Sequence, residues 1–167
     1  MRRLPLIAPG TFDAVLCADN SLVVHLLTSE DVTVALTAMS QTLREHGLLA
    51  IGLRPDGEIR AERRTSAQPQ VTRTPTRRVL SFQLWDWHPD GERYDLEYIQ
   101  LHPAPDSSNG DTWQVRTRRA TSWTITRDQL VGLVVSAADF GHITWHTPAE
   151  TAYFQPLLTG RERSEAP

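Results

Sequence analysis

The chain has 167 residues, of which 40% are hydrophobic and 22% are charged, and its formal net charge is −3. This is the composition of a soluble globular protein, long enough for one domain that buries roughly 70% of its unfolded surface. No apolar run approaches the ~18 residues of a membrane span, and the single cysteine excludes a disulfide framework or a zinc site built on cysteine pairs. A negative net charge gives no bulk attraction to nucleic acid. Taken together, these properties lead us to expect a cytoplasmic protein without nucleic-acid or membrane partners.

The first predicted element is a strand at residues 12–18. Its continuous apolar run is of the type that is buried on both faces of a parallel sheet. A helix should follow, because Thr28 and Asp31 have the spacing of a capping box. The apolar residues that share one face of this helix are Val32, Ala35, Leu36, Met39 and Leu43. Gly47 is expected to end the helix, and residues 48–54 form a second buried strand. Strand, helix and strand with short joints predict a parallel βαβ unit.

Residues 55–77 are polar and predict a long loop. From Arg54 to Arg78 there are seven arginines against three acidic residues, and Ile59 and Val71 are almost the only candidates for burial. The stretch therefore fits either contact with an anionic ligand or nucleic acid, or a solvated mobile loop. The second interpretation is our prediction.

Between residues 78 and 125 the pattern alternates with a period of two. Three stretches show it: RRVLSFQLWDWH, RYDLEYIQL at 93–101 and WQVRTRRATSWTI at 113–125. The first two are separated by a Pro-Asp-Gly turn signal. Three successive strands with short connections predict an antiparallel meander.

The C-terminal part begins with a second capping-box signal, from Thr126 and Gln129, followed by a helix that Gly141 should end. HITWH and AYFQPLLTG then predict two more strands. Residues 162–167 are expected to be a frayed tail. We expect a single domain over residues 1–161, without internal repeats.

The positions of the nine glycines exclude several glycine-rich motifs that bind phosphate or carry a nucleophile. The closest pairs, Gly47 with Gly52 and Gly52 with Gly57, are five positions apart. The chain therefore contains no G-x-G-x-x-G loop and no G-x-S-x-G elbow, and because it has no lysine it contains no Walker loop.

The ordered series of segments resembles the C-terminal half of a class I S-adenosylmethionine-dependent methyltransferase. FDAVLCADNSL is similar to the fourth strand of that family, and REHGLLAIGLR to its L-x-P-G-G-x-L segment, with Glu45-His46-Gly47 at the usual proline-glycine position. SAADFGHITWH and YFQPLLTGR resemble its C-terminal strands, and WDWHPDGERYDLEY the inserted strands of bacterial small-molecule methyltransferases. The resemblance implies an α/β fold with strands four to seven of a Rossmann-like sheet and an inserted three-stranded antiparallel meander at about 78–125.

The resemblance also implies that the first half of the sheet, with the glycine-rich cofactor loop and an acid for the ribose, is absent from this chain. The ribose acid's two charge-assisted hydrogen bonds alone are worth roughly 3–6 kcal/mol, which is about two to four decades of affinity. We therefore expect an N-terminally truncated methyltransferase that binds S-adenosylmethionine weakly or not at all by itself. Met1 and Arg2 match the segment beside the adenine, so they are the expected cofactor contacts together with Asp19 and Asn20.

The expected catalytic site lies after the first predicted strand, because ligands bind at the carboxyl ends of strands in open α/β sheets. Methyl transfer mainly requires that donor and acceptor are oriented and shielded from water. By resemblance, Asp19 and Asn20 are the catalytic positioning groups, although a plain turn is the alternative. His25 either accepts a proton from the substrate or packs beside the loop. Ser21 is an expected substrate contact.

Two more distant residues complete the expected substrate site. Arg54 ends the second predicted strand and either pairs with a substrate carboxylate or is solvated. Trp85 either forms a wall of the substrate pocket or belongs to the core. His142 and His146 share a strand face without nearby acids, and we predict no metal site.

Two other functions are compatible with the sequence. The chain is expected to act on a small-molecule methyl acceptor, but it can also be a non-catalytic methyltransferase-like half. Such a half would pair with itself or with an N-terminal half through the open edge of the strand at 12–18, an edge that also favours aggregation. A ligand-binding β domain built around 78–125 is the third alternative, and the two capped helices argue against it.

Overall fold

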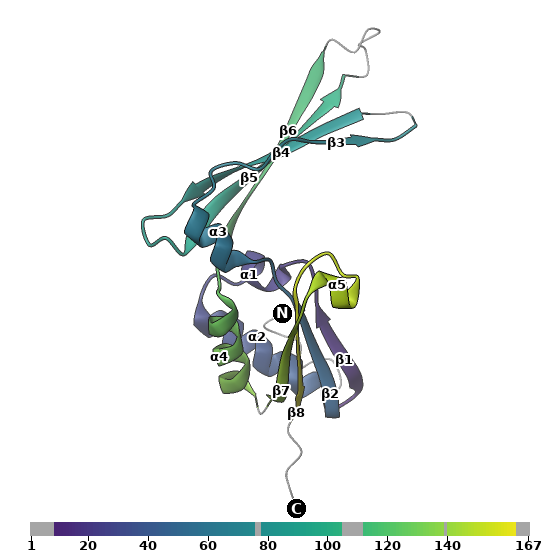
Figure 1. Cartoon of the computed structure of the whole chain (residues 1–167), viewed down its shortest axis with the longest axis vertical. Helices are drawn as coiled ribbons and strands as arrows, with labels where there is room; N and C mark the ends of the chain where they lie inside the picture. Colours follow the sequence, from purple (N-terminus) through teal and green to yellow (C-terminus); the bar gives the residue numbers. More distant parts are fainter. Residues whose placement is uncertain (1–8, 76–77, 105–111, 139, 163–167) are drawn as a thin grey trace, which may run out of the picture. The chain divides into compact units, whose positions relative to one another are not determined.

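The computed structural model describes residues 9–75, 78–104, 112–138 and 140–162 (Figure 1). It divides into two compact units, of which the first comprises Met1–Ile59 with Trp123–Pro167 and the second Arg60–Ser122. Each contains one four-stranded sheet. The single domain over residues 1–161 stays a prediction. Within the predicted tail, Glu162 belongs to a strand and residues 163–167 lie outside the described residues.

The sheet of the first unit, sheet A, has the strand order β1-β2-β8-β7. Its strands are β1 (Phe12–Cys17), β2 (Leu43–Gly52), β7 (Phe140–His146) and β8 (Leu157–Glu162). β1 and β2 are parallel, whereas β8 is antiparallel to both of its neighbours. Two helices, α1 (Ser21–His25) and α2 (Ser29–Thr42), connect the parallel pair, which confirms the predicted βαβ order.

The core of this unit lies between sheet A and the helices α2 and α4 (Arg127–Ala137), which pack on one face of the sheet (Figure 1). Both helices begin as predicted. The Thr28 hydroxyl accepts a hydrogen bond from the Asp31 N–H, and Thr126 and Gln129 form a full capping box. All five apolar residues of the predicted α2 face are buried. Satisfied N-termini and an apolar stripe toward the sheet explain why these segments are helical.

Neither glycine that was predicted to end a helix does so. α2 ends at Thr42, and Gly47 lies inside β2, in a bulge where the pairing jumps from Phe12 with Leu43 to Ala14 with Leu48. A Cβ on Gly47 would approach the Arg44 carbonyl oxygen to 2.8 Å, so the glycine is needed for a close backbone approach rather than a helix stop. Gly141 likewise lies in β7, beyond the end of α4.

The predicted burial of β1 on both faces is wrong. Leu16 is 66% exposed and Phe12 is 41% exposed, whereas Cys17 is buried in the core. The reason is that β1 is an edge strand of sheet A and the helices α2 and α4 cover one face. An apolar run shows that a strand has few polar side chains, but whether one or both of its faces are covered depends on the rest of the fold.

The sheet of the second unit, sheet B, has the order β3-β4-β5-β6. Its strands are β3 (Gln70–Arg73), β4 (Arg78–Trp87), β5 (Arg93–Pro103) and β6 (Trp113–Trp123). β4 pairs antiparallel with β3 and with β5. The meander therefore has four strands rather than the predicted three. Residues 55–77, predicted to be one long loop, contain β3 and the helix α3 (Asp56–Glu62).

The turn between β4 and β5 is the predicted one and is held by a carboxylate. The Asp90 side chain accepts hydrogen bonds from the N–H groups of Glu92 and Arg93, and Gly91 has a positive φ of 69°. These main-chain donors, led by Glu92, and the Arg93 guanidinium lower the pKa of Asp90 to about 2.

None of the described helices is long and apolar enough to cross a membrane.

Candidate site at the carboxyl ends of β1 and β2

The loop that leaves β1 has an unusual backbone. Asp19 and Asn20 have φ values of 58° and 56°, in the left-handed region. Asn and Asp tolerate this region better than other residues with a side chain, which explains this pair at a sharp turn into α1. The turn directs the chain from the end of β1 into the helix that starts at Ser21.

Asn20 joins the ends of the two parallel strands. The residue is 6% exposed, and its side-chain Oδ1 accepts a hydrogen bond of 2.6 Å from the Arg54 N–H. Arg54 follows the end of β2. Asn20 and Arg54 are thus brought together, as the topology of a parallel pair requires. Direct contact of Asn20 with a methyl donor or acceptor stays a prediction, as does pairing of Arg54 with a substrate carboxylate.

Asp19 is fixed through its main chain, and its side chain is exposed. The Asp19 N–H donates a hydrogen bond of 2.9 Å to the Tyr153 hydroxyl. The Tyr153 ring lies against Gly52, where a Cβ would be 2.9 Å from Cε1. A glycine at the end of β2 therefore leaves room for the tyrosine that holds the β1 loop. Sequence reasoning missed this role because Tyr153 is 134 positions from Asp19 and no local motif links them.

The segment that contains Tyr153 closes the same end of the sheet. The last strand was predicted from Ala152, but β8 begins at Leu157 after the short helix α5 (Pro148–Thr151) and a loop. The Pro156 carbonyl accepts a hydrogen bond of 3.1 Å from the Leu53 N–H. This loop therefore spans from the end of β1 to the end of β2, and residues 153–156 belong to the candidate site.

The other predicted site residues are dispersed. Ser21 donates a hydrogen bond of 2.7 Å to the Ala18 carbonyl, and His25 is exposed at the last position of α1. No hydrogen bond or ion pair joins His25 to Asp19 or Asn20 in the part of the chain that the structure describes. Met1 and Arg2 lie outside the described residues.

Trp85 belongs to the second unit. It is buried, its ring stacks on Tyr94 with 5.3 Å between centroids, and its Nε1 donates to Gln83 at 3.1 Å. These contacts make Trp85 part of the packing of sheet B. Its predicted role as a wall of the substrate pocket stays a prediction.

The thiol at the end of β1 is not an available nucleophile. Cys17 is 4% exposed, and burial raises the pKa of its thiol to about 11, although the Leu22 N–H opposes this rise. The thiol is therefore protonated at neutral pH, and covalent catalysis by Cys17 is excluded by its surroundings.

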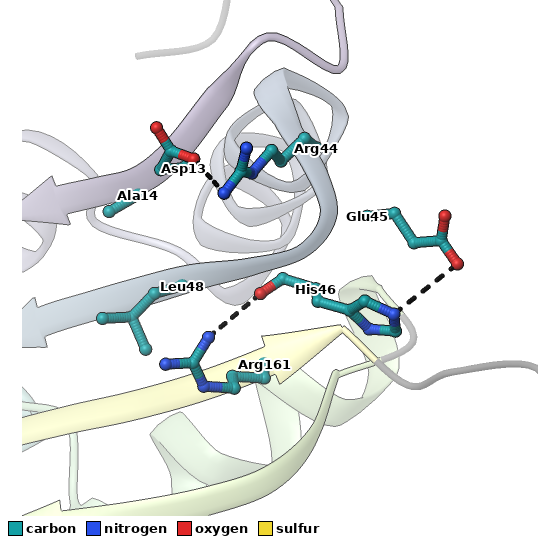
Figure 2. A pocket seen from close by; sticks show the side chains of 7 residues that line it. All are labelled: Asp13, Ala14, Arg44, Glu45, His46, Leu48 and Arg161. Atoms are coloured by element: carbon teal, nitrogen blue, oxygen red, sulfur yellow. Dashed lines mark hydrogen bonds and ion pairs between the residues drawn. The ribbon is translucent and has the colours of Figure 1, made fainter.

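A depression of about 620 Å³ lies at the opposite end of β1 (Figure 2). The residues that line it are Asp13, Ala14, Arg44, Glu45, His46, Leu48 and Arg161. Both of its arginines have partners: Arg44 forms an ion pair with Asp13, and an Arg161 Nη donates to the His46 carbonyl at 3.1 Å. These contacts stabilise the β2 bulge, so we do not place the site there.

Among the described residues, no three His, Cys, Asp or Glu side chains gather in a way that could hold a metal ion.

Comparisons with known proteins identify the fold. No protein-family model and no curated protein matches the sequence. Several solved structures are similar over nearly all of this chain. Among them are CalS10, an amino pentose methyltransferase from Micromonospora echinaspora (16% identity, TM-score 0.68), the sugar N-methyltransferase KedS8 from Streptoalloteichus sp ATCC 53650 (17%, 0.65) and an S-adenosylmethionine-dependent methyltransferase from Clostridium acetobutylicum ATCC 824 (10%, 0.65).

The match covers a larger share of this chain than of the solved structures. It spans 92%, 92% and 95% of this chain but 59%, 57% and 60% of those three structures, in the same order. The chain thus spans little more than half the length of the enzymes that it resembles. This similarity confirms the resemblance that the sequence indicated: the chain has the fold of a part of the S-adenosylmethionine-dependent methyltransferases.

Proposed function

We propose that this chain is part of a methyltransferase that transfers a methyl group from S-adenosylmethionine to an amine of a small molecule. In this proposal sheet A corresponds to strands four to seven of the Rossmann-like sheet. The observation that carries the proposal is the similarity to CalS10 over 92% of the chain, combined with a polar site at the carboxyl ends of β1 and β2. The amine acceptor is supported by KedS8, a sugar N-methyltransferase, and by CalS10, an amino pentose methyltransferase.

The residues of this chain have distinct roles in the proposal. S-adenosylmethionine supplies an electrophilic methyl group. Asp19, on a loop fixed by Tyr153, orients the reactants, and Asn20 holds that loop to the end of β2. His25, exposed near this loop in sequence, accepts the proton that the amine loses. Ser21 and Arg54 are the proposed acceptor contacts.

The described residues fit the acceptor side of such a site better than the cofactor side. Asp19 offers an exposed carboxylate, whereas the full sequence contains no glycine-rich loop. Met1 and Arg2 are proposed to approach the adenine. The proposal therefore includes weak cofactor binding by the 167-residue chain, and titration with S-adenosylhomocysteine in a calorimeter tests it. A micromolar dissociation constant would contradict weak binding.

The methyltransferase proposal is tested on the gene. We expect the DNA upstream of the Met1 codon to continue in frame and to encode an apolar strand followed by a glycine-rich loop. The extended protein should transfer a labelled methyl group to amino sugars, and His25→Ala should lower the rate by the 10²–10⁴-fold of a lost proton acceptor. An extended protein that forms this loop but methylates none of a panel of amines would overturn the proposed function.

A second candidate is a non-catalytic half that pairs with another polypeptide. The observation in its favour is β1, an edge strand of sheet A whose Leu16 is 66% exposed. Apolar edge strands are templates for pairing with another chain. An in-frame stop codon directly upstream of Met1, together with stable association of the chain with itself or a partner, would favour this candidate.

A further inference from the structure

One face of sheet B carries apolar side chains along its two central strands. In an antiparallel sheet, directly paired residues lie on the same face, and so do alternate residues of one strand. The pairs on this face are Leu80 with Leu101, Phe82 with Ile99 and Leu84 with Glu97. All but the last residue are large and apolar, so we name this surface the apolar face of sheet B.

The edge strands extend the apolar face. On β3, Val71 pairs with Leu80 and therefore lies on the same side of the sheet. On β6, the Arg119 guanidinium donates to the Glu97 carboxylate at 3.2 Å, which places Arg119 on this face as well. Val115 lies four positions before Arg119 in the same strand, so it shares that side. The apolar face thus reaches across all four strands.

The apolar face is open to solvent. Val71, Leu84 and Val115 are 53%, 38% and 63% exposed, and its other apolar residues are only partly buried. The opposite face of sheet B is covered in part by its own unit, because the Trp87 Nε1 donates to the Arg64 carbonyl at 2.8 Å. A contiguous exposed apolar surface of this kind marks an interaction site.

Like charges lie opposite each other at both ends of the apolar face. Asp86 pairs with Asp95 at one end of β4, and Arg78 pairs with Arg73 at the other. Each pair is unfavourable within one chain. Among the described residues, the side chains of Asp86 and Arg73 have no hydrogen bond or ion pair, and Arg78 lies over the Trp113 ring at 5.2 Å. One end of the face is therefore acidic and the other is basic.

We propose that the apolar face of sheet B docks against the same face of a second copy of this chain. A two-fold axis beside Phe82 and perpendicular to the strands stacks β4 on β4 of the other copy in the opposite direction. Arg78 of each copy then meets Asp86 of the other, because both are four positions from Phe82. Charges at the rim fix orientation more than affinity, and the apolar side chains between them supply the contact. This inference is independent of methyl transfer.

The size of the face suits a reversible dimer. Strands of 4, 10, 11 and 11 residues, spaced about 4.8 Å apart with a rise of about 3.3 Å per residue, span roughly 600 Å². Two copies then bury roughly 1,200 Å², which is the lower limit of specific interfaces. We therefore expect a dimer that dissociates on dilution.

Sedimentation at several concentrations tests the surface. Every protein carries Leu16→Glu, so that pairing through β1 does not contribute. We expect a dimer, and Val115→Arg should raise its dissociation constant at least about tenfold, because a charge would be buried against apolar side chains. Val135→Arg on α4, where the side chain is 49% exposed, is the matched control and should leave the dimer unchanged. A chain that is monomeric at every concentration, or a dimer that Val115→Arg leaves intact, would overturn the inference.

Charge reversal tests the two-fold arrangement. Asp86→Arg and Arg78→Asp should each weaken the dimer about fivefold, because like charges then meet twice across the interface. Each single reversal relieves a like-charge pair within the chain, with Asp95 or with Arg73, so the thermal midpoint should not fall. The chain with both substitutions should regain the original dissociation constant. If it dimerises no better than the single variants, the two copies do not meet in this orientation and the inference is wrong.

Discussion

Asn20 and Arg54 are joined by a hydrogen bond of 2.6 Å from the Arg54 N–H to the Asn20 side-chain oxygen. The bond connects the loops that follow two parallel strands, 34 positions apart in sequence. It therefore fixes the width of the candidate site at the end where β1 and β2 finish.

Replacement of Asn20 should destabilise the chain in two separable ways. Asn20→Ala removes the acceptor of the part-buried Arg54 N–H, at about 1–3 kcal/mol, and places alanine in the left-handed region, at about 1 kcal/mol. Asn20→Gly should restore the backbone part only, and Asn20→Asp should retain the acceptor. Urea unfolding of the three variants measures these free energies. Equal stability of the alanine variant and the wild type would contradict the role of this bond.

The contact between Tyr153 and Gly52 should control the mobility of the Asp19 loop. Tyr153→Phe keeps the ring and removes the hydroxyl, so the Asp19 amide should exchange its hydrogen faster. Gly52→Ala should have a larger effect, because the added Cβ would be 2.9 Å from the tyrosine Cε1 and displaces the ring. Hydrogen exchange followed by NMR measures both effects. Protection of the Asp19 amide that is unchanged in both variants would contradict the contact.

The stability of the chain should fall at alkaline pH because of Cys17. Burial raises the pKa of the folded thiol from its ordinary value near 9 to about 11, so the unfolded state loses its proton first as the pH rises. The stability is therefore unaffected by this thiol below about pH 9. Between about pH 9 and pH 11 the free energy of unfolding falls by at most about 3 kcal/mol. Cys17→Ala should flatten the dependence measured by unfolding at each pH, and an equal slope in this variant would contradict the assignment.

The turn at Asp90 should make sheet B sensitive to acid. The folded carboxyl has its pKa lowered to about 2, so it binds a proton later than the unfolded chain as the pH falls. Its contribution is therefore complete above about pH 4 and is lost as the pH approaches 2. A carbon-detected NMR titration of Asp90 should give a midpoint near 2, and Asp90→Asn should lack this acid dependence. A midpoint near the ordinary value of an aspartate would disprove the turn contacts.

The exposed edge of sheet A should mediate association of the chain. Leu16→Glu changes a side chain that is 66% exposed, so it should alter the free energy of unfolding by about 0.5 kcal/mol or less. It should, however, weaken self-association, which sedimentation at several concentrations measures. Val34→Glu on α2, where the side chain is 50% exposed, is the matched control and should leave association unchanged. Identical sedimentation of all three proteins would exclude pairing through β1.

Much of the architecture follows from local patterns. The capping residues Thr28 and Thr126 predict both long helix starts, and the alternation in residues 78–101 predicts the strands β4 and β5. The Asp19-Asn20 turn is also recognisable locally, because few residue types accept a left-handed backbone. These features depend on interactions within about four residues or on a strict period of two, which a sequence displays directly.

The remaining features depend on contacts between distant segments. Gly47 and Gly141 have the residue type of helix stops, but a β2 bulge and the β7 pairing determine their positions. The exposure of β1 depends on how many layers surround it, and the role of Tyr153 depends on β8 returning beside β2. The sequence by itself thus determined the starts of α2 and α4, the order of the predicted strands and the polar turn after β1. Only the tertiary structure decided which side chains meet there, because hydrogen bonds across 34 and 134 positions carry no local signal.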